Sequence, residues 1–248
     1  MAYSSRPAFI VLLFSAVALP ACGGTAEREG AQTPQVTAET VAHMHQHFDR
    51  VRHVEEAVIR GDLEGAQEPA RWLAEHQELA GAAASSGPYI SEMRTAAQQV
   101  ASAGDIGTAA RGAAQLAAAC GNCHAASKVA ANLPDAMVPA SADDRAGHMR
   151  EHQAAVDLLY RGLAAPSDEQ WKKGAEMLRH APLAAEDLGD IQKEAQASEA
   201  RVHELAGRAL TAAHQDSRVT VYAELVGTCA SCHGLHGKVW GPGVPRAE

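Results

Sequence analysis

Residues 106–124 read IGTAARGAAQLAAACGNCH, an alanine-rich stretch that ends in two cysteines followed by a histidine. Alanine has the highest helix propensity, and apolar side chains recur every three or four residues, so this stretch predicts a helix with one buried face. That face runs along Ile106, Ala110, Ala113, Leu116, Ala117, Cys120 and His124. A second stretch, YAELVGTCASCH at 222–233, repeats the spacing and predicts a second helix of the same kind.

The composition extends the helical prediction to the rest of the chain. Of 248 residues, 46% are hydrophobic and only 4% are aromatic, so the chain can bury a sizeable core but is poor in strand-favouring residues. We therefore expect an all-α fold. The formal net charge of −9 would repel phosphate backbones, which argues against nucleic-acid binding and favours partners with basic docking faces.

The N-terminal sequence predicts export from the cytoplasm. An apolar run at 9–19 follows Arg6; it is too short to span a bilayer but matches the core of a secretory signal. The run ends in LPACG at 19–23, which resembles the lipobox of bacterial lipoproteins, where the cysteine is lipidated and becomes the new N-terminus. The alternative is an ordinary signal peptide cut before an unmodified Cys22.

From this pattern we expect residues 1–21 to be a lipoprotein signal peptide and Cys22 to be a lipid anchor. Residues 22–37 have no apolar period and are rich in small and polar residues, which predicts a flexible tether. The protein would then sit on the periplasmic side of a bacterial membrane.

The other four cysteines fall in two C-x-x-C-H motifs, at 120–124 and 229–233, the attachment pattern of c-type haem. The two thiols of each motif add to the vinyl groups of one porphyrin, and the following imidazole reaches the iron. The motifs predict two covalent haem c groups, bound through Cys120, Cys123, Cys229 and Cys232.

Other uses of these cysteines are less consistent with the sequence. A single four-thiolate zinc site is an alternative, but the pairs lie 229 − 120 = 109 residues apart and each precedes a histidine. A thioredoxin-like redox pair needs a βαβ setting that the sequence lacks. Two disulfides would leave the two histidines unexplained.

An internal repeat accompanies the two motifs. The segment HMHQH at 43–47 matches HMREH at 148–152 at an offset of 148 − 43 = 105, close to the 109 that separates the cysteine motifs. We expect a tandem duplication, with one haem-binding unit at 38–139 and a second at 140–248. The predicted helices are 38–60, 62–83, 88–103 and 105–130, then 142–164, 167–180, 184–213 and 216–236.

The first helix of each repeat has an apolar seam that we expect to face a bundle core. In the first repeat it comprises Met44, His47, Val51, Val54 and Val58, and in the second Met149, His152, Val156, Leu159 and Leu163. His43 and His148 lie one turn before the seam histidines, where each could support a ligand. The histidines that have no matched pattern are expected to be solvated or to have ordinary hydrogen-bond partners; they are His45, His53, His76, His180, His203, His214 and His236.

A haem motif on the fourth helix of a bundle resembles the class II cytochromes c, the family of cytochrome c-prime. The resemblance implies two tandem antiparallel four-helix bundles with His124 and His233 as proximal iron ligands. In that family the distal ligand comes from the first helix, which implies Met44 and Met149. His47 and His152 are the alternative distal ligands, and an open iron position is a third possibility.

The resemblance and the motifs together predict an electron carrier rather than an enzyme. Two six-coordinate haems in one lipid-anchored molecule would pass electrons between periplasmic redox partners. One alternative is a high-spin cytochrome that binds nitric oxide or carbon monoxide or acts as a reductase. Another is a haem-based sensing module.

Overall fold

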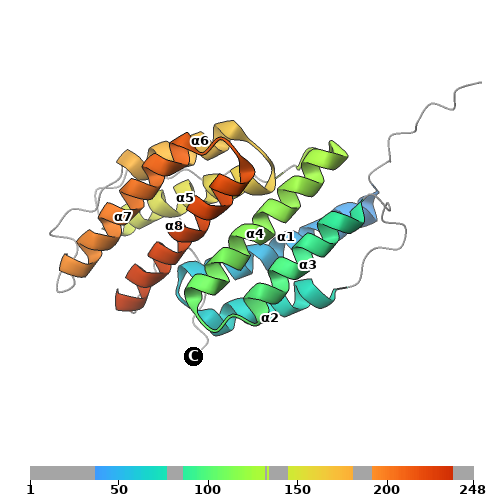
Figure 1. Ribbon diagram of the computed structural model, residues 1–248, viewed down its shortest axis with the longest axis horizontal. Coiled ribbons are helices and arrows are strands. Elements are labelled where there is room, and N and C mark those ends of the chain that lie inside the picture. Colours follow the sequence, from blue (N-terminus) through green and yellow to red (C-terminus); the bar gives the residue numbers. More distant parts are fainter. Residues whose placement is uncertain (1–36, 77–85, 132, 134–144, 181–191, 237–248) are drawn as a thin grey trace, which may run out of the picture. The chain divides into compact units, whose positions relative to one another are not determined.

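A computed structural model describes residues 37–76, 86–131, 133, 145–180 and 192–236, and these ranges contain eight helices and no strand (Figure 1). The first four are α1 (Ala38–Ile59), α2 (Leu63–Glu75), α3 (Gly87–Ala101) and α4 (Ile106–Ser127). The second four are α5 (Arg145–Ala164), α6 (Asp168–His180), α7 (Gln192–Thr211) and α8 (Gln215–His236). The all-α prediction is confirmed for these residues. The signal peptide, Cys22 and the predicted boundary at 139/140 lie outside them.

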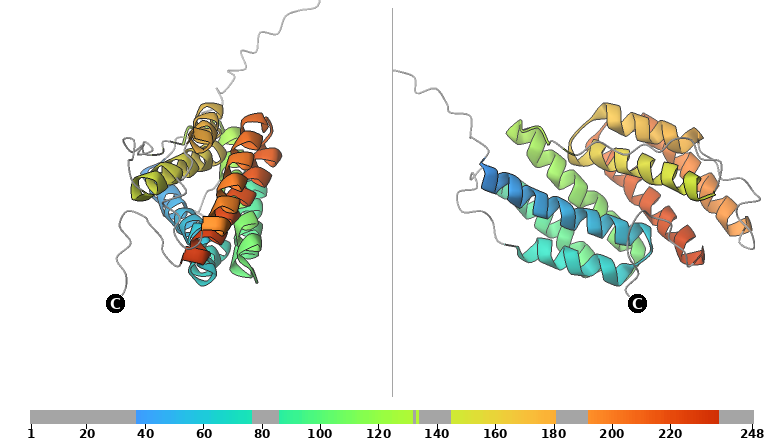
Figure 2. Two further views of the ribbon diagram at one scale, coloured as in Figure 1. Left: turned by 90° about the vertical axis from the view of Figure 1, so that its left-hand side faces the viewer. Right: turned by 180° about the vertical axis from the view of Figure 1, so that it is seen from behind.

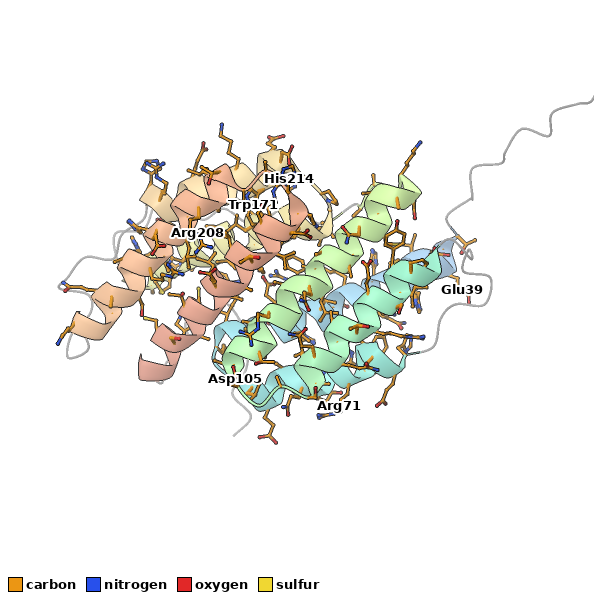
Figure 3. All side chains as sticks on the ribbon, in the orientation of Figure 1. Glu39, Arg71, Asp105, Trp171, Arg208 and His214 are labelled. Carbon is orange, nitrogen blue, oxygen red and sulfur yellow. The ribbon has the colours of Figure 1, made fainter. Side chains whose placement is uncertain are left out.

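Short polar side chains set the starts of several helices. Asp62 accepts a hydrogen bond from the amide of Gly65 at 2.8 Å, and Asp105 accepts one from Thr108 at 2.8 Å. Each carboxylate satisfies an amide that has no partner within the first helical turn. Asp105 lies at the start of α4 in Figure 3. Its cap therefore fixes the start of the helix that carries the first cysteine motif.

Successive helices pack against each other in both halves, and helices of the two halves also pack together. Figure 2 shows α1 beside α2, which the turn at Gly61 joins. Across the halves, α4 packs against α8 and α5, and α1 packs against α8. Buried apolar side chains from both halves form one contiguous core. In the described residues no helix is both long and apolar enough to cross a membrane.

The predicted seam of the first helix is correct for its aliphatic part and wrong at its start. Val51, Val54 and Val58 are buried, as are their repeat counterparts in α5. Met44, which we expected to point inward, is 41% exposed. It lies near the start of α1, ahead of the stretch that the other helices cover.

Each cysteine motif packs against the other half of the chain. A Cβ atom on Gly121, inside the first motif, would overlap the carbonyl oxygen of Leu163 at the end of α5. In the second motif, the carbonyl oxygen of Ala230 lies 3.3 Å from the position of a Cβ on Gly61. The absence of a side chain at Gly121 therefore lets α4 approach the backbone of α5.

We predict that Gly121→Ala lowers the free energy of unfolding by about 1–3 kcal/mol, the usual cost of forcing extra volume into a packed site. Urea denaturation followed by far-ultraviolet circular dichroism measures the change. Gly207→Ala is the matched control, because a Cβ there meets nothing within 4 Å and alanine favours a helix. Equal free energies of unfolding for the two variants would contradict the close packing of α4 on α5.

Candidate haem-binding sites

The two C-x-x-C-H motifs occupy the last turns of α4 and α8, and both motif histidines are oriented by a backbone carbonyl. His233 Nδ1 lies 2.8 Å from the carbonyl oxygen of Ile59, and His124 Nδ1 lies 3.3 Å from that of Val129. A carbonyl only accepts, so Nδ1 must carry the proton and the lone pair is on Nε2. Metal-bound histidines are commonly held this way, with the second nitrogen donating to the protein.

The second motif shares a cavity with both distal candidates of its repeat. The cavity has a volume of about 50 Å³. Its walls include Cys229, Cys232 and His233 from α8 and Met149 and His152 from α5. The structure therefore brings together residues that are about eighty positions apart in the sequence, which is the grouping that the sequence predicted.

The donor set of this cavity fits a c-type haem, although its volume does not enclose one. Two thiols, a carbonyl-oriented imidazole and a facing methionine and histidine are the groups that attach and ligate such a haem. About 50 Å³ is far below the roughly 300–1,000 Å³ of ordinary cofactor pockets. The lining side chains must move outward for a porphyrin to enter.

The first motif is arranged differently from the second. Cys120 packs against the shared core near Tyr160 of α5, and burial raises its pKa to about 11, as burial also raises the pKa of Cys229 in the second motif. The difference lies in the residues of the first helix. Met44 is exposed, as described above. His47 is half-buried and contacts two other histidines, His43 and His76. The described residues therefore do not group Met44 with the first motif as Met149 is grouped with the second.

Glu199 of α7 is a residue of the second site that sequence reasoning missed. Its carboxylate lies 3.9 Å from His152 Nε2 and 3.4 Å from His203 Nε2, and it lines the cavity. Burial first and Glu199 second raise the pKa of the Cys232 thiol. In the first half, burial, then His43 and His76, and then the charge of Arg94 in α3 lower the pKa of His47 to about 4. The candidate distal histidines of the two halves therefore have different charged neighbours, Glu199 beside His152 and Arg94 near His47.

A buried polar network joins helices of the two halves between the motifs. Glu55 of α1 accepts hydrogen bonds from Tyr222 of α8 and from Arg52, and Arg52 is 3.0 Å from the Asp157 carboxylate of α5. Arg161 donates to the second Asp157 oxygen at 2.6 Å. Burial raises the pKa of Glu55 to about 7, although the Arg52 charge opposes the shift. Sequence periodicity places Glu55 on α1 but does not indicate that it is buried.

Comparison of the chain with family models, with curated proteins and with solved structures gave no match. The resemblance to class II cytochromes c therefore stays a prediction from the motifs and the helix order. A functional assignment depends on the arrangement of the residues described above.

The raised pKa of Glu55 predicts a pH-dependent stability. Between the ordinary pKa of 4.5 and the folded value of about 7, the folded state keeps a proton that the unfolded state has lost. The free energy of unfolding should therefore fall by up to about 3 kcal/mol from this group as the pH rises from 4 to 8. Glu55→Gln cannot ionise and should remove this part of the decline.

Urea denaturation of the wild type and of Glu55→Gln at pH 5, 6, 7 and 8 measures the difference. Glu64→Gln is the control, because Glu64 is exposed on α2, outside the buried network, and its variant should keep the wild-type pH dependence. Parallel pH profiles for wild type and Glu55→Gln would contradict the prediction.

Proposed function

We propose that the protein is a dihaem c-type cytochrome that carries electrons between periplasmic redox partners. The observation that carries the proposal is the shared cavity of Cys229, Cys232 and His233 with Met149 and His152. When bound, each haem supplies an iron that changes oxidation state by one electron. The protein residues attach the haem, orient its ligands and keep water from it.

The proposed attachment is the same in both repeats. Cys120 and Cys123 hold the first haem and Cys229 and Cys232 the second, with His124 and His233 as proximal ligands. The hydrogen bonds from Nδ1 of both histidines to backbone carbonyls support this role, because they leave Nε2 as the nitrogen with the lone pair.

The distal ligand of the second iron is proposed to be Met149 or His152. Both line the cavity on the helix that faces α8, which supports either choice.

For the first iron the sequence candidates are Met44 and His47, and neither has a described contact with the first motif. The sites therefore need not have the same ligands or the same potential. Glu199 beside His152 and Arg94 near His47 add to this inequality, because a nearby negative charge stabilises the oxidised iron.

We also propose that the eight helices form two tandem four-helix bundles of the class II type. The order of the helices, the packing of α1 with α4 and of α5 with α8, and the position of each motif on a fourth helix support it. The shared core and the contacts of α4 with α8 mean that the two bundles would be fused along one side.

The location and partners follow from the sequence. We propose that the chain is exported, anchored by a lipid on Cys22 and held at the periplasmic side of the membrane by the tether. The net charge of −9 suits electron-transfer partners with basic docking faces.

One observation favours a second candidate function, the binding of a small gas at the first iron. Met44 is 41% exposed, and the ring of His47 contacts the rings of His43 and His76. An iron without a distal protein ligand would bind carbon monoxide or nitric oxide. The second site, with two candidate ligands in its cavity, does not favour this activity.

Haem counting tests the central claim. We predict two haems per chain by pyridine haemochrome analysis, and about one in Cys232→Ala, because this substitution removes one thioether from the second haem. Ser231→Ala is the control, since Ser231 is the exposed residue between the two cysteines of the second motif. A haem content unchanged by Cys232→Ala would contradict the attachment.

Carbon monoxide that changes the absorption of one haem would support an open first iron.

Two variants of α5 identify the distal ligand of the second iron. If Met149 is the ligand, Met149→Ala removes a far-red absorption band of methionine-ligated ferric haem and lowers the reduction potential or opens the site. In that case His152→Ala keeps the band. The reverse pattern, with His152→Ala alone converting a low-spin spectrum to high-spin, assigns His152. If neither variant altered the spectrum, the cavity would not be the haem site.

A further inference from the structure

Three histidines that the haem-attachment proposal does not require meet at one end of α1 and α2. The candidate donor nitrogens of His43, His47 and His76 all lie within 4.8 Å of one another. The ring centroids are 4.4 Å apart for His43 and His47, 5.2 Å for His43 and His76, and 5.4 Å for His47 and His76. No other such group of histidines, cysteines or carboxylates occurs in the part of the chain that the structure describes.

The helical hairpin explains why the three histidines meet. His43 and His47 are four residues apart, so they lie on successive turns of one face of α1. The turn at Gly61 reverses the chain, and His47 and His76 lie 61 − 47 = 14 and 76 − 61 = 15 residues from it. They are therefore at the same height on two antiparallel helices that pack together.

His47 supplies an observation that points to a missing ligand. Its Nε2 atom is buried and has no hydrogen-bond partner among the described residues. A buried polar nitrogen without a partner costs free energy, and a metal ion is one of the partners that an imidazole accepts. Burial and the neighbouring histidines also lower the pKa of His43 and of His47, which favours their neutral imidazoles, the form that binds metals.

The surroundings hold the three rings in place. Trp72 stacks on His76 with 3.8 Å between the ring centroids and meets His47 edge-on at 5.5 Å. Arg94 of α3 donates to the carbonyl oxygen of His76 at 2.9 Å, which ties the end of α2 to α3. Two charges face the cluster: Glu39 would favour a cation and Arg94 would oppose one.

Three imidazoles select a borderline transition-metal ion over Ca²⁺ or Mg²⁺, which prefer oxygen ligands. Zn²⁺ binds imidazole nitrogen at about 2.0–2.1 Å, so tetrahedral ligands lie roughly 3.4 Å apart. The donor atoms, which are at most 4.8 Å apart, would have to close by about 1.4 Å at the widest pair. Side-chain rotation of these three half-buried histidines can supply a movement of this size.

We propose that His43, His47 and His76 form a binding site for a divalent transition-metal ion such as Zn²⁺, with a fourth position open to water. The site does not depend on the haem proposal, because none of these residues belongs to a C-x-x-C-H motif. Because His47 would be a ligand of this metal ion, the distal position of the first iron would be filled by Met44 or would stay open.

The experiment measures Zn²⁺ binding to the full-length protein, purified without a histidine tag, by competition with a chromophoric chelator. We expect one Zn²⁺ per chain at this site and a loss of affinity of at least about 100-fold in His76→Ala, more than removal of an outer-shell partner causes. His45→Ala is the matched control, since His45 is an exposed histidine of α1 outside the cluster and its loss should leave the affinity unchanged.

Circular dichroism and the haem-to-protein ratio of each variant separate loss of the metal site from loss of the fold or of haem. His43→Ala is a second variant, with the same expected loss of Zn²⁺ affinity, for use if His76→Ala does not fold. Equal Zn²⁺ affinity in His76→Ala and His45→Ala would overturn the proposal. So would a haem spectrum that changes in His47→Ala together with no Zn²⁺ binding to the wild type, because His47 would then be an iron ligand.

Discussion

The structure depends on the pairing of Arg52 with two carboxylates that come from different halves of the chain. Arg52 and Glu55 belong to α1, and Asp157 belongs to α5. Charges buried away from water cost several kcal/mol each unless they are paired and hydrogen-bonded. The tyrosine hydroxyl of Tyr222 completes the shell of Glu55 from α8. The network can be satisfied only when α1, α5 and α8 meet in one register, so it specifies how the halves join.

This junction lies between the two cysteine motifs. Tyr160 of α5 is close enough to Cys120 for the thiol to influence its pKa, and Glu55 contributes to the raised pKa of Cys229. The first motif also packs on Leu163, at the end of α5, and the second motif packs on Gly61, in the turn after α1. If both haems bind as proposed, the shared core would set the distance between them, because the motif helices α4 and α8 pack directly against each other.

The two repeats have the same helix order but have diverged at the ends of their first helices. His152 faces Glu199 and the cavity of the second motif, whereas His47 meets His43 and His76. The difference arises in part because His76 lies opposite His47 across the α1–α2 hairpin. The two halves of the chain therefore place different side chains around their first-helix histidines.

The sequence alone determined the helical class, because alanine-rich segments with apolar residues every three or four positions favour helices whatever their neighbours are. The predicted helices begin and end within a few residues of the observed ones where both can be compared, except that the helix predicted to reach residue 83 ends at Glu75, with His76 already extended. The apolar period also placed both C-x-x-C-H segments near helix ends. It also identified Met149 and His152 as neighbours of the second motif. Tertiary structure alone decided that Met44 is exposed, that Glu55 and Glu199 line buried sites and that His76 joins His43 and His47. Periodicity defines the face of a helix, but burial and contact depend on which other helix covers that face, and this is set by long-range packing.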